Sequence, residues 1–184
     1  MNAEIDITDI IIETPRLLIR PFRINDLEDF YEYASVDGVG QMAGWKPHDN
    51  KEISRLILNE FIEGKKTFAL ELKENGKVIG SIGIEKYNEN KFNGDFNQKR
   101  GRELGYVLSK SYWGMGLMPE AVKSVISYCF EQLSLDFLTV GHFKWNKQSK
   151  SVIKKCGFQF FCEGEFTTHM GVIEHECSYV LYKQ

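Results

Sequence analysis

The segment Tyr112-Trp-Gly-Met-Gly-Leu-Met-Pro-Glu-Ala121 leads from a predicted strand into a predicted helix. Its two glycines, Gly114 and Gly116, allow the backbone to approach a ligand closely, and the free N–H groups at the start of a helix attract an anion. Residues 119–133 then carry apolar side chains at helical spacing, with a proline suited to the first turn. The segment predicts a phosphate-binding loop, although glycine spacing alone is more commonly a tight turn into a helix.

Two well-known phosphate loops do not match this segment. The nucleotide P-loop requires Gly-Lys followed by Ser or Thr, and the dinucleotide fingerprint requires a third glycine where Pro119 stands. The segment is therefore neither of these nucleotide-binding motifs.

Upstream of this segment, the sequence predicts a strand, two helices and a hairpin. Residues 17–22 form the strand, and capping-box signatures at Asn25 and Asp49 start the helices, the second of which stops at Gly64. Residues 37–50 form a loop between them. Asn75-Gly76 is a strong signal for a tight antiparallel hairpin, here between residues 67–72 and 78–87.

Downstream of the hairpin, residues 88–102 lack apolar periodicity and predict an exposed loop. Residues 102–109 form a strand with Leu104, Tyr106 and Leu108 on one face and Glu103, Gly105 and Val107 on the other. The remaining elements are a strand, a helix and two strands at residues 137–142, 148–155, 158–162 and 175–182.

This order of elements implies an α/β fold with a mixed, largely antiparallel central sheet and helices on both faces. The length of 184 residues favours a single domain, residues 1–184. The chain has 23 Lys and Arg against 26 Asp and Glu, so its net charge of -3 disfavours a dedicated nucleic-acid-binding protein.

The cysteines and the N-terminal residues indicate where such a protein works. Cys129, Cys156, Cys162 and Cys177 show no metal-finger spacing, so no metal site is expected. Residues 1–9 have no basic leader region, and no apolar run reaches transmembrane length. We therefore expect a cytoplasmic protein with reduced thiols that binds neither membrane nor nucleic acid.

Further motifs occur in an order and spacing typical of one family. They are Thr14-Pro-Arg-Leu-Leu-Ile-Arg20, Asp26-Leu-Glu-Asp-Phe30, Gly80-Ser-Ile-Gly83, Glu103-Leu-Gly-Tyr-Val107, Asn146 to Ser149 and Lys155-Cys-Gly-Phe158. Together with residues 112–121 they resemble the GNAT superfamily of N-acetyltransferases, in its ribosomal-protein N-terminal acetyltransferase branch. The resemblance runs from Ile11 to Tyr182, nearly the whole chain.

The resemblance implies acetyl-CoA as co-substrate, with its pyrophosphate on the N-terminus of the helix that follows Gly116. One departure is Ser111, where the superfamily often has Gln or Arg. The lost charge weakens binding at most, because backbone amides bind phosphate whatever the side chains. The residues implied to bind CoA are Tyr106, Val107, Leu108, Gly114, Met115, Gly116, Leu117, Met118, Asn146 and Ser149.

The resemblance also implies catalytic groups. Glu103 is the candidate general base, because a carboxylate in a partly apolar cleft has its pKa raised toward neutrality; the alternative is a solvated strand-edge charge paired with Arg102 or a Lys. The backbone N–H of Leu108 is expected to stabilise the oxyanion. Ser149 is the candidate proton donor for the leaving thiolate, and its alternative is a helix-terminal hydroxyl that bonds to backbone.

The acceptor site is less determined by the sequence. Trp45 and Tyr87 are the candidate substrate-binding residues, although Trp45 can equally pack beneath its loop. His48 is expected to be solvent-exposed beside a helix, and His142 to be a buried core histidine.

These observations predict an acetyl-CoA-dependent N-acetyltransferase that acts on a primary amine by direct attack in a ternary complex. The branch favours a protein N-terminus as acceptor. The alternatives are a polyamine or aminoglycoside acceptor, and a non-catalytic acyl-CoA sensor, which would need the glycine loop but no base. The sequence allows either a monomer or a homodimer.

Overall fold

The computed structural model describes residues 1–183, in which eight strands form one sheet and four α-helices connect them. The strands are β1 (Ile12–Glu13), β2 (Leu17–Pro21), β3 (Thr67–Leu72), β4 (Lys77–Glu85), β5 (Gly101–Leu108), β6 (Phe137–Phe143), β7 (Gln159–Thr167) and β8 (Ile173–Tyr182). The α-helices are α1 (Leu27–Ala34), α2 (Lys51–Gly64), α3 (Leu117–Glu131) and α4 (Lys147–Lys155). Short 3-10 helices are η1 (Ile24–Asp26), η2 (Gly40–Ala43), η3 (Gly94–Gln98) and η4 (Lys110–Tyr112).

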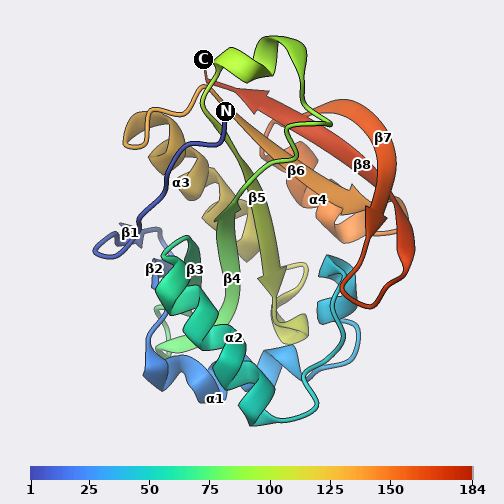
Figure 1. Ribbon diagram of the computed structural model, residues 1–184. Helices are drawn as coiled ribbons and strands as arrows, with labels where there is room; N and C mark the ends of the chain where they lie inside the picture. The colour runs from blue at the N-terminus through green and yellow to red at the C-terminus, as the bar shows by residue number, and fades with distance from the viewer. Residues whose placement is uncertain (184) are drawn as a thin grey trace.

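The sheet has the strand order β1-β2-β3-β4-β5-β6-β8-β7 (Figure 1). Within residues 1–183, β5 and β6 are the parallel neighbours, and every other adjacent pair is antiparallel. The parallel pair needs a crossover, and α3 supplies it. The predicted mixed, largely antiparallel sheet is therefore correct.

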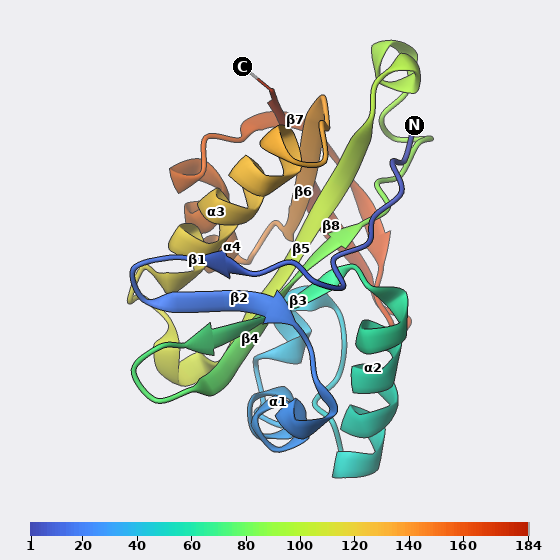
Figure 2. The ribbon, with the colours of Figure 1, turned by 90° about the vertical axis from the view of Figure 1, so that its left-hand side faces the viewer.

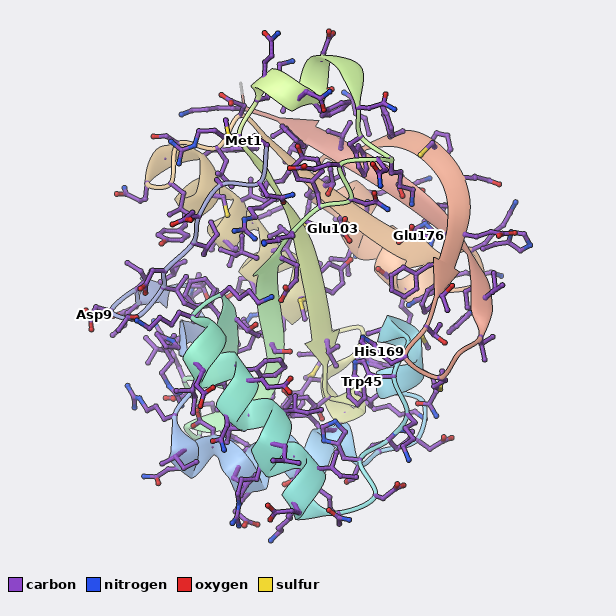
Figure 3. The ribbon with its side chains drawn as sticks, viewed as in Figure 1. Met1, Asp9, Trp45, Glu103, His169 and Glu176 are labelled. Atoms are coloured by element: carbon purple, nitrogen blue, oxygen red, sulfur yellow. The ribbon has the colours of Figure 1, made fainter. Side chains whose placement is uncertain are left out.

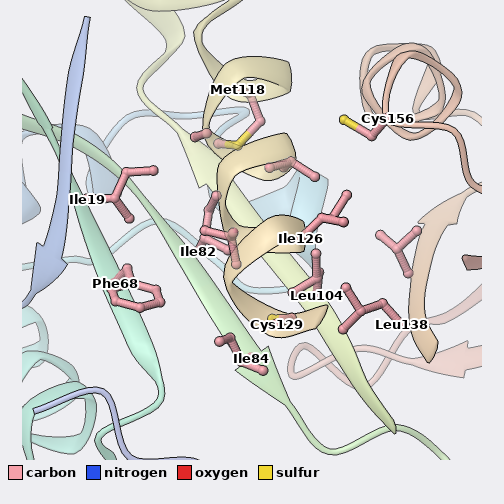
Figure 4. Close-up of a cluster of buried hydrophobic side chains, with 14 of the residues drawn as sticks. Ile19, Phe68, Ile82, Ile84, Leu104, Met118, Ile126, Cys129, Leu138 and Cys156 are labelled. Carbon is pink, nitrogen blue, oxygen red and sulfur yellow. The ribbon is translucent and has the colours of Figure 1, made fainter. Parts of the chain in front are cut away.

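Helices cover both faces of the sheet, with α1 and α2 on one side and α3 and α4 on the other (Figure 2). Side chains along β3 alternate accordingly. Phe68 and Leu70 join the core beneath α3, whereas Ala69 faces the core of α1 and α2. Figure 4 shows Met118, Ile126 and Cys129 of α3 in the larger of these cores. Burial of this apolar surface holds α3, and hence the loop before it, on the sheet.

The observed elements follow the predicted ones closely, with three corrections. β1, a two-residue edge strand paired with β2, was not predicted. β7 extends to Thr167, five residues beyond the predicted end at Cys162. Residues 88–102 were expected to be exposed, but Phe92 and Phe96 are buried against Phe137 in an aromatic cluster.

Candidate active site

A cavity of about 380 Å³ opens where β5 and β6 diverge. The two strands pair in parallel over Gly101–Glu103 and Phe137–Thr139, and the pairing ends there. Both faces of β5 line the cavity, Leu104 and Tyr106 on one and Glu103 and Val107 on the other. The cavity therefore passes through the sheet, from the α3 and α4 side to the side of α1 and α2.

The loop before α3 forms one end of this cavity. Gly114 and Gly116 have φ of 78° and 76°, in the left-handed region that favours glycine. No protein atom lies within 4 Å of the position a Cβ would take on Gly114, so the loop leaves open space in front of its backbone. Gly116 caps α3, whose first N–H groups have no partner within the helix. This end of the cavity can hold an anion.

Arg16 holds the glycine loop against α3. Its Nε donates to Glu120 Oε2 at 2.8 Å, and its guanidinium also donates to Met115 O at 2.9 Å. Sequence reasoning quoted Arg16 within a motif but assigned it no role. Because Glu120 pairs with the guanidinium, Arg16 fixes the shape of the loop rather than adding net positive charge to it.

Glu103 lies half-buried on the cavity wall, where the two strands part (Figure 3). Burial, reinforced by the negative charge of Glu176, raises the pKa of Glu103 to about 7, although Thr139 Oγ1 donates to its carboxylate at 3.2 Å. Arg102, the partner proposed in the alternative reading, donates instead to Ala3 O. A group with this pKa can accept a proton at neutral pH.

The peptide of Leu108 points into the gap between β5 and β6. Ser109 N–H donates to Ile79 O at 2.7 Å, so the odd-numbered residues of this stretch pair with β4. Leu108, an even-numbered residue, must direct its N–H and C=O the other way. Its C=O accepts from Trp113 Nε1 at 2.8 Å, and its N–H faces the opening.

Ser149 and Tyr106 meet on the α4 side of the cavity. The Tyr106 hydroxyl lies 2.9 Å from Ser149 Oγ, and burial raises the pKa of Tyr106. Asn146 caps α4 by accepting from Ser149 N–H at 3.0 Å, and its amide donates to Met42 O at 3.2 Å. Asn146 therefore ties α4 to the η2 segment across the cavity.

Comparison with known proteins identifies the family. The acetyltransferase (GNAT) domain family matches residues 16–159. The chain belongs to the GNAT acetyltransferase family. The N-acetyltransferase named p20 of Bacillus licheniformis, which is uncharacterized, is 27% identical over 152 residues, covering 79% of this chain and 80% of that protein.

Solved GNAT structures share the whole fold. The acetyltransferase (GNAT family) from Bacillus anthracis is 26% identical with a TM-score of 0.78, covering 94% of this chain and 98% of that one. The ribosomal-protein-S5-alanine acetyltransferase from Vibrio fischeri is 20% identical with a TM-score of 0.74, covering 95% of this chain and 97% of that one. The predicted family and fold are confirmed, and a ribosomal-protein acetyltransferase is among the structures that share the fold.

Most residues predicted to bind CoA do meet in the cavity of this GNAT fold. They are Tyr106, Val107, Leu108, Gly114, Gly116, Leu117, Met118, Asn146 and Ser149. Met115 was predicted to contribute its backbone N–H, which remains a prediction; its side chain is exposed and its carbonyl accepts from Arg16. These residues come from β5, the glycine loop and the N-terminus of α4, which the divergence of β5 and β6 brings together.

Two residues predicted to bind the acceptor lie elsewhere. Trp45 packs beneath its own loop, over Gly40 and against the ring of His48 (Figure 3). Tyr87 is buried in the aromatic cluster with Phe137. The prediction that His48 is exposed was wrong, because it is 6% exposed and its Nδ1 lies 2.7 Å from Ser54 Oγ.

His142 is buried as predicted, although it also touches the cavity. Its Nδ1 donates to Phe143 O at 2.8 Å, which leaves Nε2 to accept from the Tyr179 hydroxyl at 3.3 Å. Both ring nitrogens are satisfied by the protein, so His142 has no free base for chemistry.

The part of the cavity between η2 and the β7–β8 hairpin is lined by Val39, Met42, Phe143, Phe166 and Glu176. Sequence reasoning missed all five. The β7–β8 hairpin brings its tip onto the η2 segment, where His169 N–H donates to Gly44 O at 2.9 Å (Figure 3). The signal in the sequence for these five lining residues was weak, because apolar residues and a glutamate in a loop or a strand are common in any fold.

None of the helices in residues 1–183 combines the length and apolar character needed to cross a bilayer.

Proposed function

We propose that this GNAT protein transfers an acetyl group from acetyl-CoA to a primary amine. The observation that carries the proposal is the cavity through the sheet, which connects the glycine loop at one end with Glu103 on its wall. A cofactor cradle alone would not need a half-buried carboxylate of near-neutral pKa at the point where the strands part. This favours an enzyme over a non-catalytic acyl-CoA sensor.

The described residues fit acetyl-CoA. The backbone amides of the glycine loop and of the first turn of α3 would bind the pyrophosphate, because the Gly114 position leaves that space open. The pantetheine arm would lie along β5, where the even-numbered residues Leu104, Tyr106 and Leu108 turn their backbone groups into the gap. Asn146 and Ser149 would contact it from α4. Acetyl-CoA supplies a thioester whose carbonyl accepts the amine.

Each chemical task then has a residue. Glu103 accepts a proton from the acceptor ammonium, directly or through one water, and the freed nitrogen attacks the thioester carbon. Leu108 N–H donates to the thioester oxygen as negative charge develops there. The C–S bond breaks, and Ser149, hydrogen-bonded to Tyr106, protonates the leaving thiolate while it takes a proton back from solvent. The nitrogen loses its second proton to solvent as the amide forms.

The acceptor that we favour is the N-terminus of a protein. Support comes from the sequence motifs of the ribosomal-protein branch and from the Vibrio fischeri structure, whose name assigns it an alanine of ribosomal protein S5. The acceptor end of the cavity lies at the surface between η2 and the β7–β8 hairpin, where an extended peptide can enter.

The test measures free thiol released from acetyl-CoA with short peptides bearing a free N-terminus, spermidine and kanamycin as acceptors. Thermal stability is measured in parallel with and without acetyl-CoA, because a ligand of the folded state raises Tm. Peptide-dependent thiol release is the expected result. Thiol release with spermidine or kanamycin but not with peptides would show that the acceptor is a small amine rather than a protein N-terminus. A Tm shift with acetyl-CoA but no thiol release with any amine would favour the non-catalytic acyl-CoA sensor.

A further inference from the structure

Glu176 on β8 reaches the acceptor end of the cavity beside Glu103 (Figure 3). Thr139 and Gly141 are neighbours on one face of β6, because side chains alternate along a strand. Thr139 Oγ1 donates to Glu103 Oε2 at 3.2 Å, and Glu176 Oε1 lies so close over Gly141 that a Cβ there would collide with it. The two carboxylates therefore occupy adjacent positions along β6.

Lys91 holds the other oxygen of Glu176. Its Nζ forms an ion pair with Glu176 Oε2, and the side chains are only 18% and 12% exposed. Gly164 on β7 faces this lysine, since a Cβ on Gly164 would meet Lys91 Cε at 3.4 Å. Gly141 and Gly164 thus make room for the pair between the strands. Lys91 occupies Oε2, which leaves Oε1 on the cavity side.

The net charge around Glu103 favours binding of a singly charged cation. When Glu103 is ionised, the two carboxylates and Lys91 leave one net negative charge, which a single ammonium group would neutralise. An ammonium group has three N–H donors, so it can bridge two carboxylates. Glu85 on β4 does not serve in the same way, because it is not among the residues that line the cavity and its side chain is 38% exposed beside Lys66.

We propose that Glu176 anchors the ammonium group of the acceptor, holding its nitrogen against Glu103 through the oxygen that Lys91 leaves free. The inference rests on the proposed function and assigns a specificity residue to the same cavity. Glu103 takes the proton from the nitrogen, whose lone pair then attacks the thioester carbon. Glu176 stays ionised throughout, and Lys91 keeps its proton.

Glu176→Gln tests the anchor in the thiol-release assay, with the best acceptor of the amine panel. We expect KM for the amine to rise at least about tenfold, because a charge-assisted hydrogen bond is lost. The acid limb of the pH profile should also move to lower pH, because a negative charge beside Glu103 is removed. The limb reports only the charge of Glu176 near Glu103, and a residue that merely holds Lys91 in place would leave KM for the amine unchanged. The matched control is Glu163→Gln on the same β7–β8 hairpin. Glu163 forms an exposed 3.0 Å ion pair with Lys144, so this variant also removes a paired carboxylate.

Lys91→Met is the second variant and predicts a shift of opposite sign. Removing this positive charge disfavours the ionised form of Glu103, so the acid limb should move to higher pH. His142 also faces the cavity, but its ring nitrogens are both bonded and it is unchanged in either variant. Acid limbs that move in the same direction in both variants would overturn the assignment.

Binding of an ammonium ligand tests the anchor separately from catalysis. Ethylammonium is titrated into protein carrying 13C-labelled glutamate carboxyl groups, and the Glu103 and Glu176 resonances are followed. We expect saturable shifts in the native protein and binding weakened at least about tenfold in Glu176→Gln. Equal binding in both, or no saturable shift in the native protein, would overturn the anchor. If the native protein acetylates amines with unchanged kinetics in Glu176→Gln, the proposed function stands and only this inference fails.

Discussion

At the scale of single residues, the chemistry depends on Glu103. Replacing Glu103 with Gln keeps the shape and the contact with Thr139 but removes the base. We expect turnover at pH 8 to fall at least about 100-fold with acetyl-CoA binding unchanged, because general base catalysis contributes a factor of about 100 to 10,000. Steady-state thiol release measures the turnover, and the acetyl-CoA-induced Tm shift measures binding.

Native turnover should fall as the pH drops below about 7, since the pKa of Glu103 is raised to about 7 and the base must be ionised. If the Glu103→Gln variant keeps more than about a tenth of native turnover, then a residue other than Glu103 is the general base.

The same substitution should stabilise the protein at high pH. Because burial raises the folded-state pKa of Glu103 above its ordinary value, the folded protein binds this proton more tightly than the unfolded chain. That contribution is complete below the unfolded pKa and is lost as the pH rises through about 7. Glu103→Gln should therefore gain stability over the native protein between pH 5 and 8, by up to about 3 kcal/mol.

Urea unfolding at several pH values measures this difference. We expect the gain to increase up to about pH 7 and to stay constant above it. A difference that is independent of pH would contradict the raised pKa of Glu103.

At the scale of elements, the loop before α3 needs glycine at positions 114 and 116, because the backbone there is left-handed and the space in front of it must stay open for a ligand. Gly116→Val should destabilise the protein by about 1–2 kcal/mol and weaken acetyl-CoA binding at least about 100-fold, because a branched side chain at φ of 76° strains and fills the loop. Titration of acetyl-CoA and urea unfolding provide the two measurements.

Gly76→Val in the β3–β4 turn is the matched control for this loop. Gly76 has a φ of 72° and no neighbouring atom within 4 Å of its Cβ position, so the strain is similar while the cavity is untouched. This variant should lose comparable stability and keep acetyl-CoA binding. Equal loss of binding in both variants would mean that backbone strain, rather than the loop itself, weakens the complex.

At the scale of the whole molecule, the cavity exists because β5 and β6 are joined at one end and separate at the other. At the joined end, the Phe137 ring lies directly on Gly101, in the buried cluster with Phe92 and Phe96. Gly101→Ala should destabilise the protein by about 1–3 kcal/mol, because the new methyl group would overlap the ring. It should also lower turnover by disturbing the position of Glu103.

Gly105→Ala on the same strand provides the comparison for urea unfolding. No atom lies within 4 Å of its Cβ position, so its stability should stay within about 0.5 kcal/mol of the native value. If Gly101→Ala is equally harmless, then the aromatic cluster does not hold the joined end of the strands.

The sequence by itself determined the elements and the glycine loop. Alternation along residues 102–109, helical spacing in 119–133 and the Asn75-Gly76 turn depend on contacts close in the chain, so local patterns predicted them correctly. The loop was predictable for the same reason, because the left-handed conformation of Gly114 and Gly116 is a property of those residues. The joint occurrence of several motifs then predicted the family.

Only the tertiary structure decided where β5 and β6 part and which side chains meet there. Trp45 and Tyr87 were plausible acceptor residues by type, yet Trp45 packs half-buried against the core of α1 and α2, and Tyr87 is buried in the aromatic cluster with Phe137. Glu176 and Lys91 meet across 85 positions of sequence, and no local pattern records such a contact. The pKa of Glu103 likewise depends on burial and on charges from other strands, so the base becomes recognisable only when the sheet is assembled.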